Sequence, residues 1–197
     1  MGPFVLGFAT ALLVGLQATG GTAEPPDRLP IQEPSLFYTD NGTAEFTSSV
    51  PLHTFTGRSD HLTGIIDLDE NVVDFYLDLS TLETGLRRRD RDMARTLQIK
   101  EFPFAEFTGH LKERFDPTRQ DTQTVTAVGE FTIHGISQPV EINGILTLDH
   151  ETLHLQAAWT FRLEEYQIEP PGLLFYRVQQ EQAVRIRATL MAVEEIP

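Results

Sequence analysis

The chain has 197 residues and no cysteine, and 29 acidic residues against 15 basic ones give it a formal net charge of −14. This length is typical of one domain, and a chain without cysteine has no disulfide framework and no thiol nucleophile. The strong negative charge argues against nucleic acid and against strong binding to anionic membranes, because both would repel the protein.

The first segment of the sequence has the composition of an export signal. An apolar run, Phe4–Leu16, is followed by small residues, and Gly21-Thr22-Ala23 fits a small-x-small cleavage site. The run is shorter than the roughly 20 residues that a helix needs to span a bilayer. We therefore expect residues 1–23 to be a cleaved signal peptide and the protein to be exported, to the periplasm or outside the cell.

A short proline-rich segment separates this signal from the folded part of the chain. Residues 24–34 contain four prolines and no periodic apolar pattern, which is typical of an extended lead-in. Residues 35–197 are then expected to form a single domain.

Alternation of apolar and polar residues with a period of two dominates that domain and is typical of half-buried β-strands. It is clearest over residues 72–80, 124–133, 139–148, 152–161 and 183–193. Weaker alternation covers residues 35–40, 43–50, 53–59, 61–68 and 103–111. Turn-forming residues predict hairpin corners at 41–42, 69–71, 134–135 and 149–151.

Antiparallel strands that each have one apolar face must bury it, and the usual solutions are a sandwich and a closed barrel. The faces that we expect to point inward mix small and large residues, such as Gly129 with Phe131 and Ala157 with Trp159. In a sandwich this mixture is ordinary packing, whereas in an eight-stranded barrel it leaves a lumen for a long apolar ligand. The residues alone leave both architectures open.

The sequence contains no motif for catalysis or metal binding. The six histidines lack metal-ligand spacing, no serine lies in a nucleophile elbow, and no glycine-rich phosphate loop is present. His134-Gly135 has the composition of a tight turn, so we expect a structural role for this pair. The sequence therefore indicates no catalytic residue, no metal and no cofactor.

Six of the fifteen basic residues fall in residues 87–100, RRRDRDMARTLQIK, the one segment with a convincing helical pattern. On a helical projection, Arg89 and Asp90 flank an apolar face made by Leu86, Met93 and Leu97, and we expect this face to dock on the rest of the domain. We expect Arg89 and Asp90 to tie the helix to the rest of the domain by charge-assisted hydrogen bonds.

The other arginines of this helix fall together on the opposite face of the projection. They form a cationic stripe that is expected to point away from the domain: Arg87, Arg88, Arg91 and Arg95. The stripe is either a solvated helix face or a patch for an anionic headgroup or an acidic partner.

Three stretches carry a resemblance to a known family: TGLRRRDRDM (84–93), KEFPFAEFTGHL (100–111) and VTAVGEFTIHGISQPVEI (125–142). The matching residues are Thr84, Gly85, Arg89, Asp90, Met93, Phe102, Pro103 and Phe107, then Gly129, Phe131, Thr132, Ile133, His134, Gly135, Ser137, Pro139 and Val140. In these residues the chain resembles the YceI-like family of exported lipid-binding proteins. It departs from the family pattern at Asp92 and Met93, where the family usually has His and Leu.

The resemblance implies an all-β fold, an antiparallel lipocalin-like β-barrel of about eight strands with one short helix after the middle strands. It also implies non-catalytic binding, with transport or storage, of a polyisoprenoid or a similar long-chain amphiphile in the lumen. We expect eight residues to line that lumen: Phe75, Leu77, Leu79, Phe107, Phe131, Ile133, Trp159 and Phe161.

Two other functions are compatible with the sequence. A solidly packed barrel would favour a structural or stress-response interaction protein. An enzyme acting on a lipid headgroup would need a general base facing the lumen, for which His134 and Glu130 are the candidates. The sequence leaves open which lipid is bound and whether the chain forms a homodimer.

Overall fold

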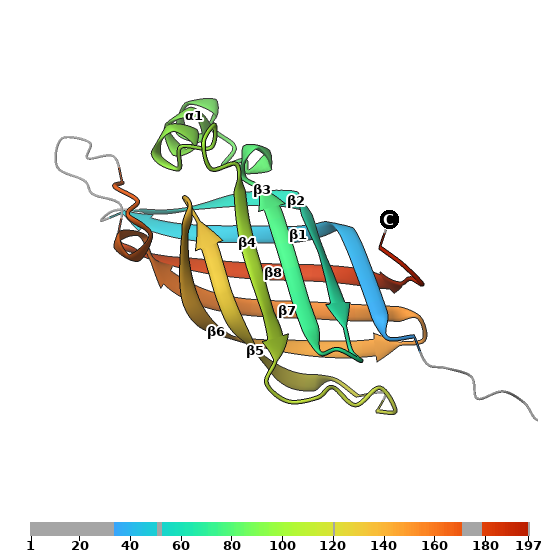
Figure 1. Ribbon diagram of the computed structural model, residues 1–197. Coiled ribbons are helices and arrows are strands. Elements are labelled where there is room, and N and C mark those ends of the chain that lie inside the picture. Colours follow the sequence, from blue (N-terminus) through green and yellow to red (C-terminus); the bar gives the residue numbers. More distant parts are fainter. Residues whose placement is uncertain (1–33, 51–52, 120, 171–178, 197) are drawn as a thin grey trace, which may run out of the picture. The chain divides into compact units, whose positions relative to one another are not determined.

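The computed structural model describes residues 34–50, 53–119, 121–170 and 179–196. Within these residues, eight strands form a closed antiparallel barrel in which each strand pairs with its neighbours in the sequence and β8 pairs with β1 (Figure 1). The strands are β1 (Leu36–Val50), β2 (His53–Asp67), β3 (Val72–Asp78), β4 (Phe104–Leu111), β5 (Gln123–Ile133), β6 (Ile136–Asp149), β7 (Thr152–Arg162) and β8 (Glu181–Ala192). The predicted lipocalin-like barrel is confirmed.

Three short helices accompany the strands in the described part of the chain. The arginine-rich stretch forms α1 (Arg87–Thr96), as predicted, and two 3-10 helices, η1 (Leu79–Thr81) and η2 (Leu163–Tyr166), follow β3 and β7. Leu79 therefore belongs to η1 and not to a strand that continues to residue 80. None of the described helices is both long enough and apolar enough to cross a membrane.

Three of the four predicted hairpin corners are turns, namely 69–71, 134–135 and 149–151. The prediction of a corner at Asn41-Gly42 was wrong, because these residues lie inside β1. The pairing of β1 with β2 shifts register between Thr39 and Ala44, which marks a β-bulge. The segments predicted as two strands each, 35–50 and 53–68, are therefore the single long strands β1 and β2.

One half of the barrel interior is filled by aliphatic and aromatic side chains. The ring of Phe131 packs edge to face on Trp159, with 5.5 Å between the centroids. A Cβ atom on Gly64 would lie 2.2 Å from the ring of Phe75, so the small residue makes room for the large one. Only a cavity of about 100 Å³ is left in this half. Here the mixture of small and large residues serves packing.

The turn between β5 and β6 is held by its neighbours. His134 and Gly135 both have positive φ, 58° and 74°, the geometry of a type I′ hairpin turn. The buried His134 donates from Nδ1 to the carbonyl oxygen of Tyr166 in η2 at 3.0 Å, and the ring of Phe102 packs on the imidazole, with 5.1 Å between centroids. The turn thus joins the hairpin to η2 and to the segment before β4.

Gly135→Ala is expected to destabilise the protein more than Gly85→Ala, although the two glycines have nearly the same φ, 74° and 76°. A Cβ on Gly135 would lie 2.5 Å from the ring of Phe102, whereas nothing lies within 4 Å of a Cβ on Gly85. We expect a loss of about 1 kcal/mol in the free energy of unfolding for Gly85→Ala, from backbone strain alone, and about 2–3 kcal/mol for Gly135→Ala. Urea unfolding measures both; equal losses would show that Phe102 moves aside without cost.

Candidate functional site

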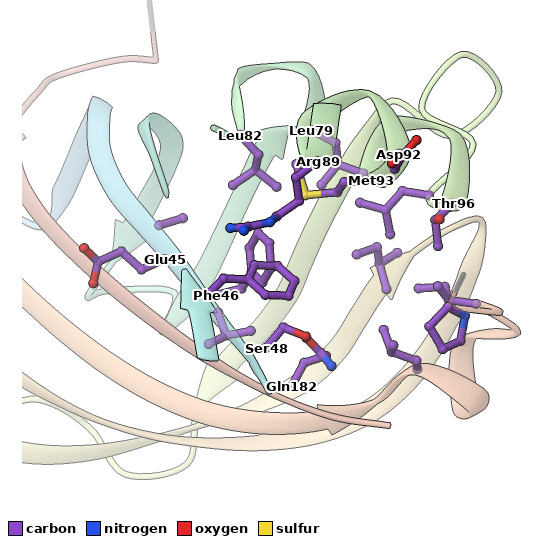
Figure 2. Close-up of a pocket in the computed structure, with 18 of the residues that line it drawn as sticks. Glu45, Phe46, Ser48, Leu79, Leu82, Arg89, Asp92, Met93, Thr96 and Gln182 are labelled. Carbon is purple, nitrogen blue, oxygen red and sulfur yellow. The ribbon is translucent and has the colours of Figure 1, made fainter. Parts of the chain in front are cut away.

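The other half of the barrel, next to α1, contains a cavity of about 800 Å³ (Figure 2). Its wall comes from β1, β2, β3, β5, β7 and β8 and from α1, η1 and η2, and most of the lining side chains are apolar. Leu86, Arg87 and Arg88 also line it and are exposed, so the cavity opens to solvent beside the first turn of α1. The expectation that Leu86 docks on the barrel was wrong, because its side chain is 55% exposed at this opening.

The eight residues predicted to line the lumen are divided between the two halves of the interior. Five line the large cavity: Leu77, Leu79, Phe131, Ile133 and Phe161. The other three line the small inner cavity and not the large one: Phe75, Phe107 and Trp159. Among the described residues, four line both cavities and form the boundary between them: Ala44, Leu77, Phe131 and Val184. Contact of any of these residues with a ligand stays a prediction.

The family-matching pair at the start of α1 is held in two different ways. The Asp90 carboxylate accepts hydrogen bonds from the backbone N–H of Thr84 at 2.9 Å and from its hydroxyl at 2.6 Å. The Arg89 guanidinium lies over the ring of Phe55, 4.4 Å from the centroid, which is a cation–π contact. Asp90 thus fixes the connection before the helix. Arg89 joins the helix to β2 by the cation–π contact and forms no side-chain hydrogen bond with a described residue, contrary to the prediction.

The cationic stripe does not behave as one surface. Arg87 and Arg88 line the outer part of the cavity, whereas Arg91 and Arg95 do not; Arg95 lies 3.5 Å from the carboxylate of Asp92. The prediction that all four arginines point away from the barrel was therefore wrong for Arg87 and Arg88. The first turn of α1 lies beside the cavity opening and does not pack on a solid part of the barrel. Side chains from more than one face of this turn therefore border the opening.

Two buried polar side chains lie in the described wall of the cavity. Ser48 of β1 is 1% exposed and Gln182 of β8 is 4% exposed. Thr47 pairs with Ala183 in the antiparallel junction of β1 and β8. Ser48 and Gln182 are the next residues along the two strands and are therefore neighbours across this junction. Neither residue was predicted from the sequence, although Gln182 lies two residues before the inward-facing Val184, and this spacing could have placed it on the inner face.

The two candidate general bases named from the sequence, His134 and Glu130, do not line the large cavity. His134 is bonded to Tyr166 through Nδ1, and Glu130 is exposed. Burial raises the pKa of the Tyr166 phenol to about 12, so this side chain stays neutral near pH 7. In the described residues, no group of three His, Asp or Glu side chains is arranged to hold a metal ion.

A closed eight-stranded antiparallel barrel with an apolar internal cavity beside a short helix is the architecture of a lipocalin-like binding protein. The family model of the YceI-like domain matches residues 38–192, and the chain belongs to this family. A comparison with curated protein sequences finds no match.

Solved structures share this fold at low sequence identity. A polyisoprenoid binding domain from Saccharophagus degradans, implicated in plant cell wall breakdown, has a TM-score of 0.68 and 15% identity, over 82% of this chain and 100% of that chain. BcnA from Burkholderia cenocepacia has a TM-score of 0.64 and 11% identity, over 76% and 95%. The YceI protein of Campylobacter jejuni has a TM-score of 0.51 and 12% identity, over 90% and 95%. At these identities the likeness shows the fold.

The emission of Trp159, the only tryptophan of the chain, is expected to report the length of a bound tail. Trp159 lines the inner cavity and not the large one, and its indole packs on Phe131 at the boundary. A short tail that stays in the large cavity leaves these surroundings unchanged, whereas a long tail must displace Phe131. In fluorescence titrations we expect solanesol to shift the emission maximum and geraniol to leave it unchanged, with calorimetry showing that both bind.

Phe131→Ala provides the matching variant, because it joins the two cavities. We expect a loss of about 3–5 kcal/mol in the free energy of unfolding, and we expect the shorter alcohol to shift the emission of this variant as well. Equal shifts by both alcohols in the unmodified protein would contradict the boundary at Phe131.

Proposed function

We propose that the protein binds a long-chain apolar amphiphile of the polyisoprenoid type in its large cavity, and that it carries or stores this lipid without changing it chemically. The observation that carries the proposal is the cavity of about 800 Å³ with its largely apolar wall. This volume falls within the range of about 300–1,000 Å³ found for small-molecule sites. The shared fold of the polyisoprenoid binding domain from S. degradans supports the choice of ligand class.

The hydrophobic effect is sufficient to hold such a ligand. Burial of each methylene group gains about 0.8 kcal/mol, so a tail that buries about ten of them gains about 8 kcal/mol before the cost of association. Association costs at least about 4 kcal/mol, so a dissociation constant of about 1 μM requires about fifteen buried methylene groups. A longer tail that also enters the inner half would bind more tightly.

The alternatives have less support. The only described carboxylates that line the cavity are Glu45, 3.1 Å from Arg58, and Asp92, 3.5 Å from Arg95. Each of these carboxylates already has an arginine as its partner, so neither is free to act as a general base. A solidly packed barrel is at odds with the volume of the cavity.

We further propose that the protein is exported and that its carrier function takes place in the periplasm or outside the cell. The support is the apolar run and cleavage site of residues 1–23 and the proline-rich segment 24–34. The expected signal peptide lies outside the described residues. A closed barrel that shields an apolar chain suits the transfer of lipid through an aqueous compartment.

Native mass spectrometry of protein purified without detergent tests the carrier function. We expect an additional mass that solvent extraction removes and that matches a long-chain lipid. Protein that carries no such mass and shows no affinity for isoprenoid probes would contradict the proposal.

Val184→Trp is expected to weaken binding of geranylgeraniol at least about tenfold, a loss of about 1.4 kcal/mol. Val184 lines both cavities, so the larger side chain fills space that the ligand needs. The adjacent Ala183 is exposed, so Ala183→Trp makes a larger change in size outside the lumen and should leave the affinity unchanged. Calorimetry measures both, with circular dichroism as the check on folding; equal losses would show that the lipid binds elsewhere.

A further inference from the structure

We propose that the mouth of the cavity selects amphiphiles with an anionic headgroup, a phosphate monoester in particular, and that Arg87, Arg88 and Arg89 bind this group. The inference rests on the proposed function, because it concerns the polar end of a ligand whose tail fills the cavity. The three arginines line the same cavity as the apolar residues that would hold the tail, and Figure 2 shows Arg89 among the lining side chains.

The charges around the cavity are unequal. Two described acids line it, and each is paired with an arginine that does not: Glu45 with Arg58 at 3.1 Å and Asp92 with Arg95 at 3.5 Å. None of the three consecutive arginines that line the cavity forms a salt bridge with any residue in the described part of the chain. In a protein with a net charge of −14, these three guanidinium groups form a local positive site that attracts anions.

Arg89 is held in place for such a contact. Its guanidinium lies over the ring of Phe55, which in turn packs edge to face on Phe46, with 6.1 Å between centroids. The neighbouring Asp90 accepts two hydrogen bonds from Thr84 and is thereby directed away from Arg89. A guanidinium stacked on a ring keeps its N–H donors at the edge of the plane, where they bind phosphate oxygens in pairs.

A buried hydroxyl on the same part of the wall provides an independent observation. Ser48 is the partner of Phe55 across the β1–β2 pair, is 1% exposed, and its Oγ has no hydrogen-bond partner among the described residues. Figure 2 shows Arg89 reaching from α1 across the mouth, with Ser48 and Gln182 on the wall beyond Phe46. A buried hydroxyl without a partner destabilises a protein, and a ligand oxygen is the partner that this position lacks.

Gln182 does not supply the missing donor. Its Nε2 donates to the carbonyl oxygens of Gln179 at 2.7 Å and Glu181 at 3.1 Å, so both of its N–H groups are used. The hydroxyl of Ser48 is therefore the free buried donor beneath the arginines. Three cations at the mouth and one hydroxyl donor below them match the acceptor oxygens of a phosphate monoester better than an uncharged alcohol.

Farnesyl phosphate and farnesol test the proposal, because the two probes share a tail and differ only in the headgroup. We expect the unmodified protein to bind farnesyl phosphate at least about tenfold more tightly than farnesol at low salt, and we expect this difference to shrink as sodium chloride is added. Arg87→Gln/Arg88→Gln should weaken binding of farnesyl phosphate about fivefold to tenfold and leave farnesol unaffected.

Arg91→Gln/Lys100→Gln is the matched control, since it removes the same charge from residues 87–100 at positions that neither line the cavity nor pair with the acids that do. We expect this control to bind both probes like the unmodified protein. Equal affinity for farnesol and farnesyl phosphate, or equal losses in the two double variants, overturns the headgroup proposal and leaves the carrier function standing. If the protein binds neither these probes nor any other isoprenoid, both proposals fail.

Ser48→Ala gives a second measurement in which stability and binding change in opposite directions. Removal of an unpartnered buried hydroxyl should raise the melting temperature of the ligand-free protein by about 2–4 °C, while binding of farnesyl phosphate weakens. Thr47→Ala, on the exposed face of the same strand, should leave the binding unchanged. A Ser48→Ala protein that melts earlier than its parent, or that binds farnesyl phosphate equally well, overturns the role of Ser48.

Discussion

The pairing of β1 with β8 closes the sheet, and the cavity depends on this closure. β1 has 15 residues and pairs with β2 along one edge and with β8 along the other. A closed sheet has no free edge and satisfies its backbone hydrogen bonds between neighbouring strands. In a sandwich, the apolar face of one sheet must be covered by a second sheet, which would fill the interior. In a barrel the closed sheet surrounds its own interior. Half of that interior can therefore remain empty while the apolar inner face stays shielded from water.

The filled half supports the hollow half. Phe131 packs on Trp159, Phe161 and Tyr166, with centroid distances of 5.5, 5.4 and 5.6 Å, and the same ring lines the large cavity. Side chains around an empty space lose the dispersion contacts that a packed interior gives, so a hollow region lowers stability. The aromatic cluster offsets that loss and places a rigid boundary at the end of the large cavity. One residue, Phe131, therefore belongs both to the core and to the wall of the large cavity.

The sequence predicted the strands, the helix and the inward faces, because period-two and helical patterns are local. The prediction from the sequence failed at positions whose structure depends on residues far away along the chain. Asn41-Gly42 has the chemistry of a hairpin turn, yet β1 continues through it because both β2 and β8 pair with the residues on either side. The helical projection gave the angles of Arg87 and Arg88 but not the opening that these side chains border. Ser48 and Gln182 were not predicted, because the alternating pattern assigns polar residues to the outer face. A polar residue on the inner face therefore cannot be recognised from this pattern.

The polar residues of the cavity have a distribution that suits a carrier. An apolar wall provides affinity that grows with the buried area of the tail but discriminates poorly between tails of similar size. Selectivity requires groups that lose a partner when the wrong ligand binds, and such groups are costly in a packed core. The large cavity has them at its mouth and on one wall, in Arg89 and Ser48, while the inner half is apolar apart from the Trp159 indole N–H and Glu106. Because the groups that would select the ligand lie outside the aromatic cluster, changes in headgroup preference can occur without disturbing the residues that hold the barrel together.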